Sequence, residues 1–161
     1  MEPYSEIYPG VWKGRWGAPE TSTPFSILQP ESASLPENLK HAPAPPAPVK
    51  TGELLFETSA RGCLLELPLA QDEQIYGFGL QLKSFLQTGK KKTIRVNSDP
   101  VADTGDSHAP VPFYVSSAGY AVLVDTARYA SFYCGYHSRK EEIDEERARK
   151  GDFKAEGIEV L

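Results

Sequence analysis

The densest group of side chains that could take part in chemistry lies between residues 95 and 108. The sequence there reads Arg-Val-Asn-Ser-Asp-Pro-Val-Ala-Asp-Thr-Gly-Asp-Ser-His and includes Asp99, Asp103, Asp106 and His108. We expect a loop between two strands, and loops that a rigid sheet holds are where binding groups concentrate. The spacing lacks the alternating oxygen ligands and closing glutamate of a calcium loop. Asp and Asn also form turns through their own side chains, so a ligand-binding role and a structural role both stay open.

The glycines and lysines of the chain do not complete a nucleotide-binding motif. Gly77-Phe78-Gly79 lacks the third glycine of a dinucleotide fingerprint, because position 82 is Leu. Gly89-Lys90 has neither the upstream glycine nor the following Ser or Thr of a phosphate-binding loop. We therefore predict that Lys90-Lys91-Lys92 forms the solvated tip of a hairpin rather than a phosphate site.

The chain has two cysteines, Cys63 and Cys134, which are too few for a four-ligand zinc site. Each lies in an apolar stretch, so we expect reduced core residues, and a single bridge between them is the less favoured alternative. The sequence also has no nucleophile elbow and no helical zinc motif. No metal and no other cofactor is expected.

Charge and hydropathy argue against two classes of partner. The 161 residues carry 17 Lys and Arg against 22 Asp and Glu, a net charge of −5, whereas nucleic-acid-binding proteins normally present a positive surface to phosphate. The longest strongly apolar run, Tyr120 to Val124, is far too short to cross a bilayer. Residues 1–5 lack the basic start and apolar stretch of a signal peptide. We expect a cytoplasmic protein with no nucleic-acid or membrane partner.

Prolines divide the chain into three parts, since ten of the 14 fall in the first 48 residues. Residues 1–28 contain Trp12 and Trp16 and are expected to pack onto a folded body, with a short strand at Phe25 to Leu28. Stacking of the two Trp rings on a sugar is the less favoured alternative. Residues 29–53 are predicted to be a proline-rich linker or loop, with an SH3-type ligand as the less favoured alternative. Residues 54–161 form the body.

The body has the pattern of short strands separated by turns. Segments 54–58 and 63–67 flank Ser59 to Gly62 at a hairpin-like spacing. Further strands are predicted at residues 74–79, 93–97, 111–116, 120–125 and 131–136. With hardly any 3.6-residue periodicity, this spacing predicts an all-β fold, an antiparallel sandwich or barrel.

Two segments near the end of the chain differ from this pattern. Residues 138–150 are almost entirely charged and are predicted to be a solvated helix or a loop. Residues 157–161 alternate as a strand does, without a closing turn. We therefore expect the body to be truncated at its C-terminus.

Four motifs of the body stand in an order that resembles a known family. They are Tyr76-Gly77-Phe78-Gly79, Asn97-Ser98-Asp99, His108-Ala-Pro-Val-Pro-Phe113-Tyr114-Val115 and Gly119-Tyr120-Ala-Val-Leu-Val-Asp125. Together they resemble the N-terminal domain of glycoside hydrolase family 31, over roughly residues 54–136. The family commonly has Gly-Glu after the first aromatic-Gly pair, where this chain has Gly79-Leu80-Gln81. The resemblance implies an antiparallel β-sandwich of the galactose mutarotase-like supersandwich type.

The resemblance also implies a function, that of a non-catalytic N-terminal domain of a retaining α-glycosidase. Asp99 would then line the sugar pocket and bind substrate, while Asn97 and His108 would organise the loop. The two catalytic carboxylates of a retaining enzyme, about 5 Å apart, would come from a (β/α) barrel of the same polypeptide. This chain has neither the length nor the alternation for such a barrel. We therefore expect no catalytic residue in this chain and no hydrolysis by it alone.

The expected partners are that barrel and an α-linked oligosaccharide or glycoside, with glucose or xylose units. The alternative is a stand-alone carbohydrate-binding or interaction module with no enzyme attached. The unfinished last strand favours the first hypothesis, because an independent module is expected to complete its sheet.

Overall fold

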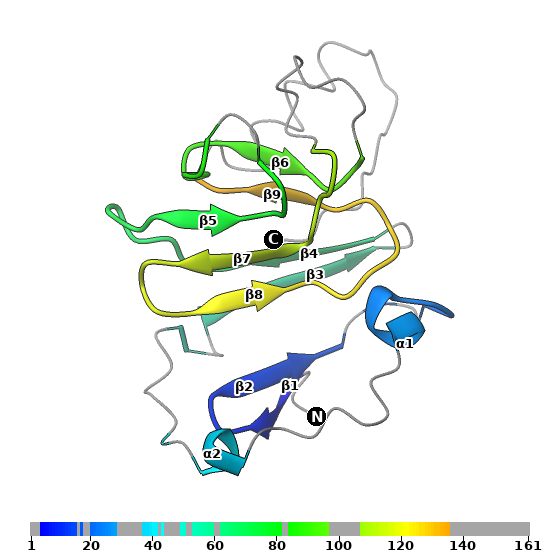
Figure 1. Ribbon diagram of the computed structural model, residues 1–161, viewed down its shortest axis with the longest axis vertical. Helices are drawn as coiled ribbons and strands as arrows, with labels where there is room; N and C mark the ends of the chain where they lie inside the picture. Colours follow the sequence, from blue (N-terminus) through cyan, green and yellow to red (C-terminus); the bar gives the residue numbers. More distant parts are fainter. Residues whose placement is uncertain are drawn as a thin grey trace.

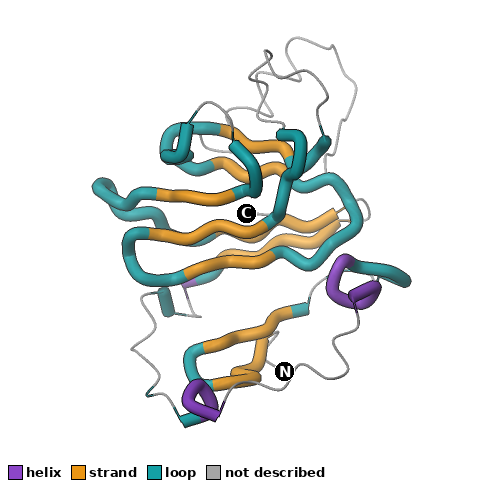
Figure 2. Tube along the Cα trace, in the orientation of Figure 1, coloured by secondary structure: helices purple, strands orange, loops and turns teal. Residues whose placement is uncertain are grey.

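The part of the chain that the computed structural model describes is almost entirely β-structure. It comprises residues 4–15, 17, 20–28, 37–41, 43, 49–50, 53–59, 62–81, 84–96 and 107–135. The elements in chain order are β1 (Tyr4–Tyr8), β2 (Val11–Gly14), α1 (Pro24–Leu28), α2 (Glu37–Lys40), β3 (Leu55–Ser59), β4 (Gly62–Glu66), β5 (Ile75–Gly77), β6 (Lys91–Thr93), β7 (Phe113–Ser116), β8 (Ala121–Leu123) and β9 (Ser131–Tyr133). Each of the two helices is a single turn (Figure 2).

The strands pair into small antiparallel sheets. The pairs are β1–β2, β3–β4 and β6–β9, and the three-stranded sheet has the order β5-β7-β8. In Figure 1 the β3–β4 pair lies behind β7 and β8, while β6 and β9 lie above β5. The prediction of an all-β antiparallel fold is confirmed.

The β5-β7-β8 sheet has one face turned to the core and one turned away from it. Tyr114 of β7 pairs with Val122 of β8, and both pack in the core. Val115, the next residue of β7, pairs with Tyr76 of β5 and with Ala121 of β8, on the opposite face. This alternation follows from the two-residue period of a strand.

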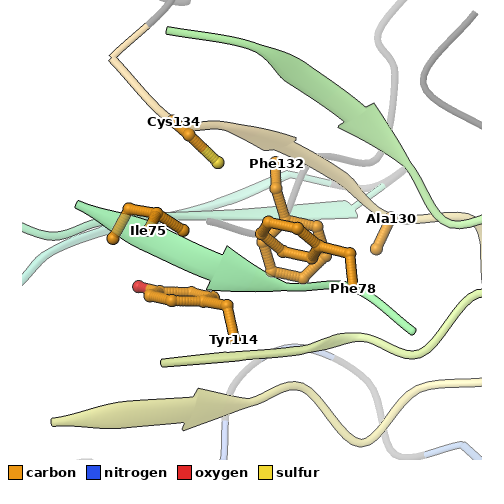
Figure 3. Packing of buried hydrophobic residues seen from close by; sticks show 6 residues of the cluster. All are labelled: Ile75, Phe78, Tyr114, Ala130, Phe132 and Cys134. Carbon is orange, nitrogen blue, oxygen red and sulfur yellow. The ribbon is translucent and has the colours of Figure 1, made fainter. Parts of the chain in front are cut away.

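The core lies between the β5-β7-β8 sheet and the β6–β9 pair. Its centre is aromatic, with the Phe78 and Phe132 ring centroids 4.8 Å apart and Tyr114 5.6 Å from Phe78 (Figure 3). Ile75, Ala130 and Cys134 complete the buried cluster. Because interiors are close-packed, these rings hold the two sheets in one relative position.

The prediction of a strand at Phe25 to Leu28 is wrong, because this segment is the helix α1. Thr23 precedes the helix, and its hydroxyl accepts a hydrogen bond from the Ser26 N–H at 3.2 Å. The Ser26 hydroxyl in turn accepts from the Thr23 N–H at 2.7 Å. This reciprocal pairing at the N-terminus of a helix, followed by Pro24 in the first turn, outweighs the apolar character that suggested a strand.

The prediction of a solvated Lys90-Lys91-Lys92 tip is also wrong. The turn lies one step earlier, at residues 87–90, where the Lys90 N–H donates to the Gln87 carbonyl. Lys91 and Lys92 belong to β6, and the Lys92 side chain is 4% exposed. A lysine can occupy such a position because its long aliphatic stem packs as an apolar group.

Strand β6 therefore starts and ends earlier than the predicted strand at 93–97. It ends at Thr93, where the Arg95 N–H turns back to the Thr93 carbonyl at 3.0 Å. Val96 makes one isolated parallel bridge, with Ser107.

The other predicted strands and the 54–67 hairpin are confirmed within a few residues. Trp16, most of residues 29–53, and the predictions for 138–150 and 157–161 lie outside the described residues. Within the described part, no helix has the length and apolar character needed to span a membrane.

Candidate functional site

The first motif, Tyr76 to Gly79, has an unusual backbone. Three successive residues have positive φ angles, 133° at Gly77, 66° at Phe78 and 79° at Gly79. Phe78 is the one non-glycine residue with positive φ among the described residues, and its ring is completely buried. A non-glycine residue adopts this conformation at a cost, and the surrounding structure must hold it there.

The backbone of this motif is hydrogen-bonded to the segment that carries the third motif. The Phe78 N–H donates to the Phe113 carbonyl at 2.8 Å, and the Leu80 N–H donates to the Ala109 carbonyl at 3.1 Å. The two segments approach so closely that a Cβ at Gly79 would lie 2.0 Å from the Ala109 oxygen. The glycines are therefore needed for this approach.

The predicted binding loop starts and ends at one place in the structure. The chain enters it at Val96 and returns at Ser107, and these two residues form the parallel bridge. Ser107 is buried, and its hydroxyl has no hydrogen-bond partner among the described residues. His108 follows it and is exposed. Asn97 and Asp99, the other predicted site residues, lie outside the described residues, as do Asp103 and Asp106.

A buried cation lies next to the first motif. The Lys92 ammonium donates to the Gln81 side-chain oxygen at 3.0 Å. The Gln81 amide nitrogen donates in turn to the Phe78 carbonyl at 2.8 Å. Gln81 therefore links Lys92 to the strained backbone of the first motif. Sequence reasoning missed this burial, because three consecutive lysines usually indicate a solvated segment.

Glu73 is a second buried charge that the sequence did not reveal. Its carboxylate accepts hydrogen bonds from the Ser116 hydroxyl, from the Tyr120 hydroxyl at 2.7 Å and from the Ala70 N–H at 3.0 Å. Burial alone raises the pKa of this carboxyl, but the three donors lower it and prevail. Burial, with the nearby Glu73 charge, also raises the pKa of the Tyr120 hydroxyl. Tyr120 therefore stays protonated and Glu73 stays ionised, so Glu73 acts as a structural hydrogen-bond acceptor.

The cysteines lie in different environments. Cys63 is half-buried and Cys134 is buried, and both are free thiols. Burial raises the pKa of the Cys134 thiol to about 12, so it stays protonated and unreactive. Within the described residues, no group of three His, Cys, Asp or Glu side chains could hold a metal ion.

The fourth motif ends at Asp125, which binds the N-terminal segment. Its carboxylate accepts from the Phe25 N–H at 3.0 Å and from the Thr23 hydroxyl at 2.7 Å, so it caps α1 from elsewhere in the chain.

Nearby, the Glu20 carboxylate accepts from the Ala127 N–H at 2.7 Å and from the Thr126 hydroxyl. We call these contacts between residues 20–25 and 125–127 the clasp. They attach the N-terminal segment at residues 20–25, whereas Trp12 in β2 is 47% exposed.

No family model matches the chain. Two curated proteins are similar to it over part of its length. The alpha-xylosidase XylQ of Lactiplantibacillus pentosus is 32% identical over 92 residues, which make up 57% of this chain and 11% of that protein. An alpha-xylosidase of Emericella nidulans is 30% identical over 97 residues, 60% of this chain and 11% of that protein. The chain thus spans only about a tenth of the length of these relatives, and the predicted resemblance to an α-glycosidase family is confirmed as a partial match.

Proposed function

We propose that this chain is a non-catalytic β-sandwich domain of a retaining α-glycosidase, which buttresses the catalytic barrel and contributes a loop to the substrate pocket. The partial match carries the proposal, because about 60% of the chain corresponds to only 11% of two alpha-xylosidases. An α-linked xylose or glucose residue is accordingly the substrate of the longer polypeptide.

The geometry next to the predicted loop supports this role. The bridge between Val96 and Ser107 brings the two ends of the loop together, and the Gly77 to Gly79 backbone holds the segment that follows. A loop anchored in this way can present a ligand-binding side chain with little loss of entropy on binding. We assign that role to Asp99, because an ionised carboxylate accepts hydrogen bonds from two neighbouring sugar hydroxyls. Asn97 and His108 organise the two ends of the loop.

The chemistry of the described carboxylates supports a non-catalytic domain. Retaining hydrolysis requires a nucleophilic carboxylate and an acid about 5 Å apart. Glu73 is the buried acidic residue of the described part, and three protein donors already occupy its oxygens. Such a carboxylate is neither a free nucleophile nor a proton donor.

The first test is the activity of the 161-residue chain with aryl α-xyloside and aryl α-glucoside substrates. We expect no release of the aryl alcohol above the buffer blank, because the acid pair is supplied by the barrel. The comparison is the polypeptide that the gene encodes up to its stop codon. We expect that polypeptide to contain the barrel and to hydrolyse one of the two substrates. Turnover by the 161-residue chain would contradict the proposal, and a stop codon directly after Leu161 would favour a stand-alone module.

The second test is the Asp99→Ala substitution in the polypeptide that extends to the stop codon. Loss of hydrogen bonds to a charged acceptor costs about 1.5–3 kcal/mol, so kcat/KM is expected to fall about 10- to 150-fold. Asp72→Ala, an exposed carboxylate outside this loop, is the control and is expected to leave kcat/KM within about threefold of the unsubstituted enzyme. Unchanged kinetics for Asp99→Ala, with an unchanged melting temperature, would leave Asp99 as a turn residue.

A further inference from the structure

The face of the β5-β7-β8 sheet that points away from the core is apolar across all three strands. Strand pairing places Tyr76, Val115 and Ala121 in one row across the sheet, and Phe113 pairs with Leu123 in the next row. None of the five side chains is charged. Phe113 is 40% exposed, Val115 39% and Leu123 45%. We call these five residues the outer face.

A sheet face of this composition is not normally exposed to solvent. A sheet with one face in water usually alternates apolar residues toward the core with polar residues toward solvent. Here β7 reads Phe-Tyr-Val-Ser, and its outward residues are Phe113 and Val115. In Figure 1 none of the described elements crosses in front of β7 and β8 on the side turned to the viewer. An exposed apolar face of this kind is typical of a surface that packs against another apolar surface.

An aromatic side chain stands at the border of the outer face. Phe85 is 79% exposed, and its ring centroid lies 5.1 Å from that of Tyr76. The neighbouring residue Leu86 forms a bridge with Tyr76 and is 39% exposed. Phe85 thus extends the outer face beyond β5 with a large apolar group.

The loop that carries Phe85 is held rigidly by a buried polar side chain. Gln87 is completely buried, and its amide nitrogen donates to the Ser84 carbonyl at 2.5 Å and to the Phe85 carbonyl at 3.3 Å. The Ser84 hydroxyl donates to the Leu86 carbonyl at 2.8 Å. The segment thus buries its amide and exposes its phenyl ring, the reverse of the usual preference. Aromatic side chains that are already held in one position are frequent among the residues that carry most of the binding energy of an interface.

We propose that the outer face, with Phe85 as its anchor, is the surface on which this chain packs against the adjoining domain of the same polypeptide. The proposal rests on the proposed function, in which that domain is the catalytic barrel. About nine tenths of each alpha-xylosidase lies outside the matched region, so the matched part of those relatives has a large covalent neighbour.

The size of the outer face favours a covalently attached neighbour over a separate molecule. Together with Phe85 and Leu86, its exposed apolar area is on the order of 500 Å², within the range of functional patches on monomers. A stable complex of two separate molecules buries about 800 Å² on each partner. A tethered domain needs less area, because the linker gives it a high effective concentration. Because the outer face is apolar and carries no charge, we expect the matching surface on the neighbour to be apolar as well. Helices or a second sheet can present such a surface.

Val115→Lys tests the proposal in two polypeptides, the 161-residue chain and the polypeptide that extends to the stop codon. In the 161-residue chain the new ammonium stays in solvent, and the melting temperature is expected to change by less than about 2 °C. In the longer polypeptide the charge is buried, and a fall of at least about 4 °C is expected for the transition of this domain. Ile27→Lys, on α1 and 72% exposed, is the control and is expected to have no effect in either polypeptide.

Photo-crosslinking provides a measurement that does not depend on stability. A benzoylphenylalanine at position 113 of the longer polypeptide is expected to crosslink within the same molecule, to residues beyond 161. The same group at position 27 is expected to give no such product. Crosslinks between two copies, no crosslink at position 113, or an equal effect of Val115→Lys in both polypeptides would overturn the proposal. If the longer polypeptide hydrolyses α-glycosides while these results are negative, the inference alone fails and the proposed function stands.

Discussion

The motif Gly77 to Gly79 determines where the segment 109–113 lies. The Phe78 ring fills the centre of the aromatic core, while its backbone adopts a left-handed conformation between two glycines that also have positive φ. The side chain and the backbone thus act together, since the ring fixes the position and the peptide groups bind residues 109–113. The motif is therefore a structural device that aligns the end of the predicted binding loop.

Gly79→Ala is expected to destabilise the chain much more than Gly89→Ala does. Both glycines have nearly the same φ, 79° and 78°, so the left-handed conformation costs alanine about 1–2 kcal/mol at each position. A Cβ at Gly79 would also meet the Ala109 oxygen at 2.0 Å, whereas at Gly89 it would meet nothing within 4 Å. We expect a difference of at least about 2 kcal/mol in the free energy of unfolding, measured in urea. Equal losses for the two variants would show that space at Gly79 is not limiting.

Glu73 makes the stability of the chain depend on pH in a defined window. Its pKa is lowered from 4.5 in the folded chain, so the unfolded chain binds a proton more readily there. The stabilisation by Glu73 is therefore complete above about pH 4.5 and is lost as the pH falls through the folded pKa.

Glu73→Gln tests this assignment. At pH 7 we expect a loss of about 1–3 kcal/mol in the free energy of unfolding. The amide oxygen of Gln accepts hydrogen bonds less strongly than a carboxylate does, and the amide NH2 group faces at least one of the three donors that bind Glu73. The difference between the original chain and the variant is expected to shrink as the pH falls below 4.5. The control is Glu53→Gln, at an exposed position, which is expected to change the free energy of unfolding at pH 7 by less than about 0.5 kcal/mol. A difference for Glu73→Gln that stays constant from pH 7 to pH 3 would contradict the role of its charge.

At the scale of elements, short-range signals decide where each strand and helix begins. The Thr23 and Ser26 hydroxyls start α1, and the turn at residues 87–90 starts β6. Element β6 then places Lys92 inward, because the residues of a strand alternate between its faces. The burial of this lysine follows from the pairing of β6 with β9, which covers the side chain and brings Gln81 within reach.

The clasp is expected to be a local attachment, which Asp125→Ala would release. The substitution removes the acceptor for the Phe25 N–H and the Thr23 hydroxyl, a helix cap of about 1 kcal/mol. We expect the Phe25 and Ile27 amides to lose protection in hydrogen exchange, while the amides of β7 and β9 keep theirs. Asp72→Ala, an exposed carboxylate in the body, is the control. Unchanged protection of Phe25 would show that α1 is held by other contacts, and loss of protection in β7 would show that the clasp belongs to the core.

At the scale of the whole molecule, two faces of one sheet have different roles. The inner face of β5-β7-β8 joins the β6–β9 pair through Phe78, Tyr114 and Phe132 and forms the core. The outer face is apolar as well, and we propose that a neighbouring domain packs on it. The proposed function assigns to this domain a structural role and a loop at the substrate pocket, and the expected lack of hydrolysis by the isolated chain belongs to that proposal.

The sequence by itself determined the all-β character of the chain, most of its strands and its relation to α-glycosidases, because turns, alternation and short motifs are local properties. It also predicted a binding loop with Asn97, Asp99 and His108, of which only His108 lies in the described part, so this loop stays a prediction. Only the tertiary structure decided that Lys92 and Glu73 are buried, that Asp125 caps α1 and that Phe85 and the outer face are exposed in the described part of the chain. These features depend on residues brought together from far apart in the chain, and a local pattern carries no information about such partners.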